Sequence, residues 1–76
     1  MKTVLEILTG IRPEFDFAGS EDFIEEGLLD SFDVVTLVCD IEKNYAISIE
    51  GVDILPESFR NLAAINALLQ RYGVQQ

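Results

Sequence analysis

Apolar residues recur at spacings of three and four positions in three stretches of the chain, which predicts three amphipathic helices. The stretches cover residues 2–11, residues 31 to about 44, and residues 58 or 61 to 72. Pro13 ends the first of these helices, because proline cannot continue a helix. Gly73 ends the last of them, because glycine tolerates the backbone conformation that follows a helix. The predicted core stripes are, in chain order, Val4, Leu5, Ile7, Leu8 and Ile11; Val34, Leu37, Val38, Ile41 and Tyr45; and Leu62, Ile65, Leu68 and Leu69.

The segments between these helices carry different patterns. Residues 13–30 form a loop that is long for so small a domain, and such loops are usually functional. A single helical turn is expected near residues 21–25. Residues 46–49 alternate like a strand but have no second strand to pair with, so we interpret them as an extended connection. The apolar residues of the long loop predict that it packs on the core: Phe15, Phe17, Phe23, Ile24, Leu28 and Leu29.

A short third helix is predicted over Ile54 and Leu55, capped by Asp53 and ended by Pro56. Together with the three longer helices it gives an all-α fold, a small four-helix bundle with a long loop between helices one and two. A chain of 76 residues allows one small domain, so residues 1–76 are predicted to form a single domain. The hydrophobic content of 49% is ample for a folded core.

The net charge bounds the choice of partners. Fourteen acidic residues against five basic ones give a formal charge of −9. Nucleic acid and anionic membrane surfaces would repel such a chain, whereas partners with basic patches would be steered toward it. The same acidity also serves solubility, so charge alone does not separate these two readings.

The residues that usually carry catalysis are missing from the sequence. The chain has no histidine, no Gly-x-Ser-x-Gly elbow, no cysteine–histidine metal cluster and no glycine-rich phosphate loop. We therefore predict no catalytic residue and no metal site, and a protein that is not an enzyme. A single cysteine, Cys39, cannot form an internal disulfide, and no apolar run approaches the 18 residues of a membrane span. These features predict a cytoplasmic protein, and we expect a monomer.

Ser31 stands at the junction between the polar, turn-rich loop and the second helical stretch. Aspartate and serine are good helix-start residues, so Asp30-Ser31 predicts the first turn of that helix. A hydroxyl there lies at the positive end of the helix dipole, near free backbone N–H groups, where an attached phosphodiester is favourably placed. A serine at a helix start is most often only a cap, so the functional reading depends on the residues around it.

Residues 26–33, Glu-Gly-Leu-Leu-Asp-Ser-Phe-Asp, closely resemble the modification site of acyl carrier proteins. The likeness covers nearly the whole chain, including the aromatic Tyr45 at the end of helix two and the segment of residues 53–59. The resemblance implies that Ser31 carries a 4′-phosphopantetheine arm, which a phosphopantetheinyl transferase takes from coenzyme A. It also implies that the protein is a carrier whose partner enzymes supply the chemistry.

Helix two has a second apolar stripe, formed by Phe32, Val35 and Cys39, on the face that it shares with Ser31. Three apolar residues on this face predict a contact surface. The alternative is that this helix is buried on most sides. The resemblance implies that partners contact the helix at six positions: Asp30, Phe32, Asp33, Val35, Cys39 and Glu42.

Helix two departs from typical fatty-acid carriers at Thr36, Lys43 and Asn44, where acidic residues are common. These departures argue against a standard fatty-acid synthase, and Lys43 and Arg60 are candidates for selecting a specialised partner by charge. The first hypothesis is an acyl carrier for fatty-acid, polyketide or related biosynthesis, served by a loading ligase and downstream synthase or transferase enzymes. The second is an aminoacyl or peptidyl carrier loaded by an adenylating ligase. The third, of a different class, is an unmodified acidic interaction module.

Overall fold

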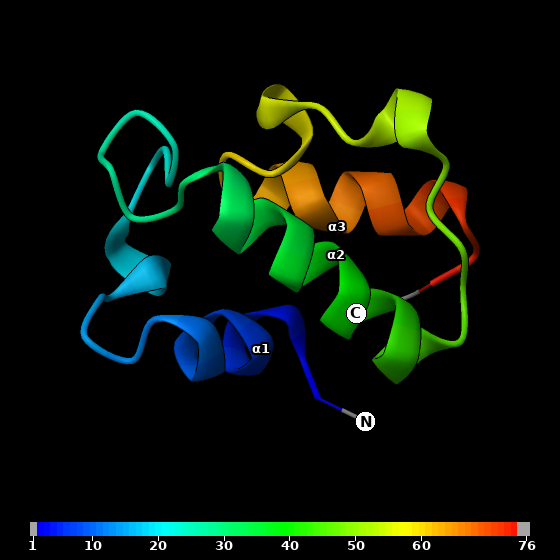
Figure 1. The fold of residues 1–76 in the computed structure, drawn as a ribbon, viewed down its shortest axis with the longest axis horizontal. Coiled ribbons are helices and arrows are strands. Elements are labelled where there is room, and N and C mark those ends of the chain that lie inside the picture. The colour runs from blue at the N-terminus through cyan, green and yellow to red at the C-terminus, as the bar shows by residue number, and fades with distance from the viewer. Residues whose placement is uncertain (1, 75–76) are drawn as a thin grey trace.

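Three α-helices form the protein in the computed structural model, which describes residues 2–74. They are α1 (Val4–Ile11), α2 (Ser31–Tyr45) and α3 (Leu62–Arg71). Figure 1 shows α2 crossing the middle of the molecule, with α1 on one side and α3 on the other. The connection from α2 to α3 runs back along α3, so its middle part returns toward the first turn of α2 (Figure 1).

Local sequence signals account for the helix ends, and the three predicted helices are confirmed. Thr3 caps α1 in a reciprocal pair with Glu6, in which the Glu6 N–H donates to Thr3 Oγ1 and the Thr3 N–H donates to Glu6 Oε1. Asn61 caps α3 by accepting the N–H of Ala64. Gly73 follows α3 with a φ of 82°, a left-handed conformation that favours glycine.

The predicted short third helix over Ile54 and Leu55 is wrong. The structure has two separate 3₁₀ turns, η2 (Gly51–Asp53) and η3 (Pro56–Ser58), and these two residues lie between them. Proline suits the first position of a helical turn, so Pro56 begins η3 and does not end a helix. The Asp53 carboxylate accepts hydrogen bonds from Arg71 at the end of α3 and from Tyr72 directly after it, and is therefore not used as a cap.

The long loop packs on the core, as predicted. It contains one 3₁₀ turn, η1 (Phe17–Gly19), which the pattern did not predict. The single helical turn expected near residues 21–25 is present as a turn over residues 23–27, in which the Glu26 N–H donates to the Asp22 carbonyl over 3.0 Å. The rings of Phe17 and Phe23 meet edge to face with centroids 5.1 Å apart. The buried core consists of Val4, Ile7, Leu8, Phe17, Phe23, Leu29, Leu37, Val38, Ile41, Ile49, Phe59, Ile65, Leu68 and Leu69.

The prediction that Leu5 belongs to the core is wrong, because Leu5 is 36% exposed. Val4, Ile7 and Leu8 share one face of α1, whereas Leu5 is turned about 100° from Val4 on a helix of 3.6 residues per turn.

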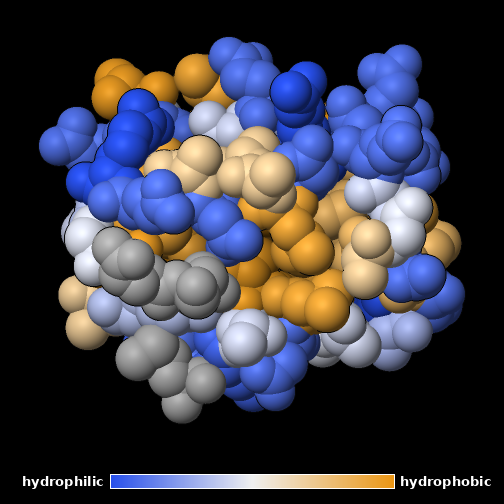
Figure 2. All heavy atoms as spheres, turned by 180° about the vertical axis from the view of Figure 1, so that it is seen from behind, coloured by the Kyte–Doolittle hydropathy of each residue, from blue (hydrophilic) through white to orange (hydrophobic). Residues whose placement is uncertain are grey.

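Figure 2 shows the molecule from behind, where apolar side chains gather in a hollow ringed by polar ones. Residues 46–49 form no strand, as expected, and Ala46 leaves α2 through a left-handed φ of 54°.

Within residues 2–74, no helix combines the length and the apolar character that crossing a bilayer requires.

Candidate functional site

Ser31 is the first residue of α2, and its neighbour Asp30 is the residue that caps the helix. The Asp33 N–H donates to Asp30 Oδ1 over 2.9 Å, and the Asp30 N–H donates to Asp33 Oδ2 over 3.2 Å. This reciprocal cap is a capping box built from two aspartates. Because Asp30 supplies the cap, the hydroxyl of Ser31 has no hydrogen-bond partner among the described residues, and the side chain is exposed.

The start of a helix favours a negatively charged group attached to that hydroxyl. The first backbone N–H groups of a helix lack intrahelical acceptors, and the helix dipole places partial positive charge at the same end. A phosphodiester at Ser31 would lie beside these groups, an arrangement common for bound phosphates. The site is therefore suited to a covalently attached phosphate group.

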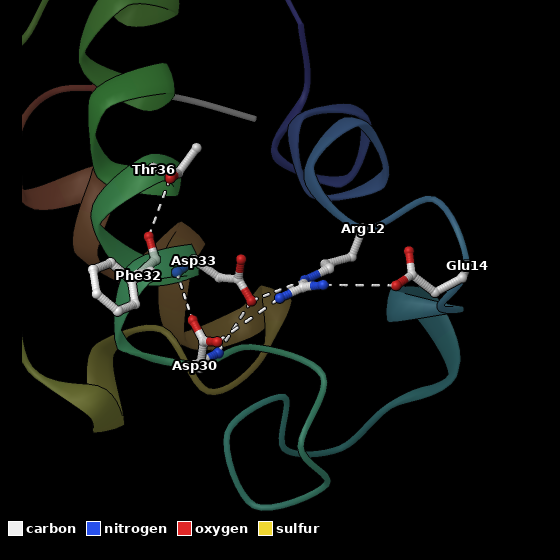
Figure 3. A network of polar contacts seen from close by, with 6 residues as sticks. All are labelled: Arg12, Glu14, Asp30, Phe32, Asp33 and Thr36. Atoms are coloured by element: carbon white, nitrogen blue, oxygen red, sulfur yellow. Dashed lines mark hydrogen bonds and ion pairs between the residues drawn. The ribbon is translucent and has the colours of Figure 1, made fainter.

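Arg12, directly after α1, joins the end of that helix to the start of α2 (Figure 3). Its Nε donates to Asp33 Oδ2 over 3.0 Å, and its Nη2 lies 3.8 Å from Asp30 Oδ2. Its Nη1 lies 3.8 Å from Glu14 Oε2. The hydrogen bond to Asp33, with the attraction of the three carboxylates, raises the pKa of Arg12, so the guanidinium stays charged.

The acidic positions that the resemblance implied as partner contacts differ in how accessible they are. The Asp30 side chain is 61% exposed, whereas that of Asp33 is 13% exposed and engaged by Arg12. Glu42 is half-buried, and its Oε2 accepts the backbone N–H of Ile49 over 2.8 Å. Only Asp30 among the three therefore presents most of its side chain to solvent.

The apolar face beside Ser31 is open to solvent. Phe32 is 85% exposed and Val35 is 59% exposed, and Cys39 further along α2 is exposed too. The alternative that this helix is buried on most sides is wrong, because its buried side chains are confined to the stripe of Leu37, Val38 and Ile41. The exposed side chains form an apolar surface on the face of α2 that, as the helical phase predicted, they share with Ser31.

A groove with a volume of about 360 Å³ runs beside Ser31, and the sequence pattern did not predict it. One side is the first turns of α2 with the end of the long loop, and the other is the stretch between η2 and η3. Ser31 and Asp30 border the groove, and its remaining lining residues are Ile24, Leu29, Val34, Val35, Ile54, Leu55 and Pro56. The groove thus offers apolar surface next to the serine.

The far wall of this groove is tied to the end of α3 by a polar cluster. The Tyr72 hydroxyl donates to Asp53 Oδ2 over 2.5 Å and accepts the Glu50 N–H over 3.0 Å. Arg71 Nη2 donates to Asp53 Oδ1 over 3.1 Å. The hydrogen bond to Asp53 raises the pKa of Tyr72, so the phenol remains a donor at neutral pH. We call these four residues the Tyr72 cluster.

Tyr72→Phe should loosen the groove wall without disturbing the core. The Ile54 and Leu55 N–H groups donate to Gly51 and Asp53 within the wall, so their exchange with solvent reports on its order. We expect these two amides to exchange several-fold faster in the variant, measured by hydrogen exchange, while core amides of α2 keep their rates.

Tyr45→Phe is the matched control for this variant, because it removes a tyrosine hydroxyl that donates to the Lys2 carbonyl over 2.6 Å, outside the groove lining. It should leave the exchange of Ile54 and Leu55 unchanged. Equal exchange of both amides in wild type and Tyr72→Phe would show that the Tyr72 cluster does not hold the wall.

A family model described as a phosphopantetheine attachment site matches residues 2–69. Comparisons with curated proteins and with solved structures gave no match. Since the matched range takes in α1, the long loop, α2 and most of α3, the chain belongs to the phosphopantetheine-binding carrier family. Members carry a covalently attached 4′-phosphopantetheine and are carriers, not catalysts, so this protein is a phosphopantetheine carrier protein.

Proposed function

We propose that Ser31 is the attachment site of the 4′-phosphopantetheine arm, and that the protein holds acyl intermediates for fatty-acid, polyketide or related biosynthesis. One observation carries this proposal: the Ser31 hydroxyl is exposed and unbonded because Asp30 caps α2 in its place. When attached, the arm supplies a thiol that holds the cargo as a thioester. The chain itself supplies the site of attachment and the surface that partner enzymes recognise.

The neighbours of Ser31 bear on how its proton leaves during attachment. The chain has no histidine, and the carboxylates of Asp30 and Asp33 are engaged in the cap and with Arg12. We therefore expect the base that takes the hydroxyl proton to come from the phosphopantetheinyl transferase. The role of this chain is to present the oxygen at an exposed helix start.

Acyl cargo is supported by the chemistry of the groove beside Ser31. Seven of its nine lining residues are apolar, including Ile54 and Leu55 on the far wall. Burial of an acyl chain against such side chains is favourable, at roughly 25 cal/mol per Å² of apolar surface removed from water. A charged or strongly polar cargo would gain nothing comparable there.

An aminoacyl or peptidyl cargo is the second candidate. The charge of the exposed surface of α2 supports this candidate. Thr36 and Lys43 are exposed at positions where typical fatty-acid carriers have acids, so this surface differs from theirs in charge. An adenylating ligase would load such a cargo. In either case the proposed partners are a phosphopantetheinyl transferase that attaches the arm, a ligase that loads the cargo, and a downstream synthase or transferase that receives it. The proposed setting is the cytoplasm.

Attachment and loading can be tested in sequence on the same sample. The apo-protein, incubated with coenzyme A and a phosphopantetheinyl transferase, should gain one phosphopantetheine by intact mass, and fragmentation should place it on Ser31 and not on Ser20. The product is then offered fatty acids and amino acids with candidate ligases. Loading of fatty acids supports the first candidate and loading of amino acids the second, while attachment at any other serine would contradict the proposed site.

A further inference from the structure

Arg12 brings a positive charge to the site where carrier recognition is expected to depend on negative charge. The chain has only five basic residues, and the contacts of Arg12 converge on the two carboxylates that flank Ser31. The other ion pair of the described residues, Arg71 with Asp53, lies at the far end of α3. Figure 1 places that end of α3 opposite the first turn of α2.

Both flanking carboxylates are engaged by groups of the chain itself. Asp33 Oδ2 accepts from both Arg12 Nε and the Asp30 N–H, over 3.0 and 3.2 Å. Asp30 Oδ1 accepts the Asp33 N–H, and Asp30 Oδ2 faces the Arg12 guanidinium at 3.8 Å. A basic side chain of a partner meets two carboxylates that already face an arginine of the chain (Figure 3).

We infer that Arg12 is a specificity-determining residue that withholds Asp33, and in part Asp30, from the basic residues of partner enzymes. This inference rests on the proposed attachment at Ser31. Arg12 lowers the local charge of the two acids from −2 to −1 and occupies the inner carboxylate in a hydrogen-bonded pair. Recognition at this end of α2 then depends less on charge and more on the exposed side chains of Phe32 and Val35.

Arg12→Gln should expose both acids to a partner with a basic docking surface. With a transferase of that kind and coenzyme A, we expect the KM for the apo-protein to fall about five- to tenfold at low ionic strength, within the range of electrostatic steering. The kcat should not change. The gain should disappear at ~1 M salt, where the Debye length is about 3 Å.

Arg71→Gln is the matched control, because it makes the same change in net charge and also removes an arginine from an aspartate. At an ionic strength of about 0.1 M, where the Debye length is about 10 Å, its KM should stay within about twofold of wild type because Arg71 lies at the far end of α3. Arg12→Lys, which keeps the charge but not the planar fork, should stay close to wild type at low salt.

A second variant keeps the inference testable if Arg12→Gln disturbs the fold. Arg12→Met also removes the charge and the hydrogen bond to Asp33 while it keeps an unbranched apolar stem, so the KM of the transferase should fall as for Arg12→Gln. An unchanged or raised KM for either folded variant would overturn the inference. Absence of modification in the wild type would instead contradict the attachment site itself.

Discussion

Ser31→Ala should abolish attachment of phosphopantetheine while leaving the protein folded. The substitution removes the only oxygen of the side chain that the arm can use, so modification by a transferase with coenzyme A should fall below detection in intact mass spectra. Stability should stay within about 0.5 kcal/mol of wild type, because the hydroxyl is exposed and unbonded and alanine is a good helix former. Loss of attachment therefore cannot be attributed to unfolding.

Ser20→Ala and Ser58→Ala are the matched controls for this experiment. Both serines are less exposed than Ser31, and the Ser20 hydroxyl donates to Glu26 Oε1 over 3.0 Å. Each control variant should be modified at the wild-type rate. Modification that persists in Ser31→Ala, or that is lost in either control, would show that the arm is attached elsewhere.

Leu37→Ala and Ile41→Ala should each lower the free energy of unfolding by roughly 2–5 kcal/mol, because truncation of a fully buried side chain leaves a cavity. Both side chains are 0% exposed on the inward stripe of α2. A loss of this size is serious for a small domain, whose total stability is usually about 5–15 kcal/mol. Chemical denaturation of the purified variants measures the loss directly.

Val35→Ala and Cys39→Ala lie on the exposed face of the same helix and provide the comparison. Val35 is 59% exposed, so its truncation should cost less than about 1 kcal/mol, in line with exposed positions generally. The same change should slow transfer to a partner enzyme if this face is the docking surface. Destabilisation of Val35→Ala equal to that of Leu37→Ala would mean that the face is part of the core.

The helices and the position of Ser31 were predictable because local signals determine both. The 3.6-residue spacing of apolar residues predicted α1, α2 and α3, and caps at Thr3, Asp30 and Asn61 set where each helix begins. The same periodicity predicted which face of α2 is buried and which is exposed. Leu5 was misassigned because it lies at the edge of an apolar stripe, where spacing alone does not decide burial.

The surroundings of Ser31 were decided only by the tertiary structure. The Arg12–Asp33 pair joins residues 21 positions apart, and the groove wall at Ile54 and Leu55 is separated by 19 to 24 positions of sequence from the α2 residues that line the same groove. No periodicity or capping signal encodes such contacts, because they depend on how the helices pack against each other.

The predicted short helix failed for the same reason. Capping preference allowed Asp53 to begin a helix, but in the folded chain its carboxylate accepts hydrogen bonds from Arg71 at the end of α3 and from Tyr72 directly after it. The sequence by itself therefore determined the helices and an exposed serine at the start of α2. Packing decided that an arginine directly after α1 pairs with the aspartates that flank this serine and that an apolar groove runs next to it, since both bring together segments that are distant in the chain.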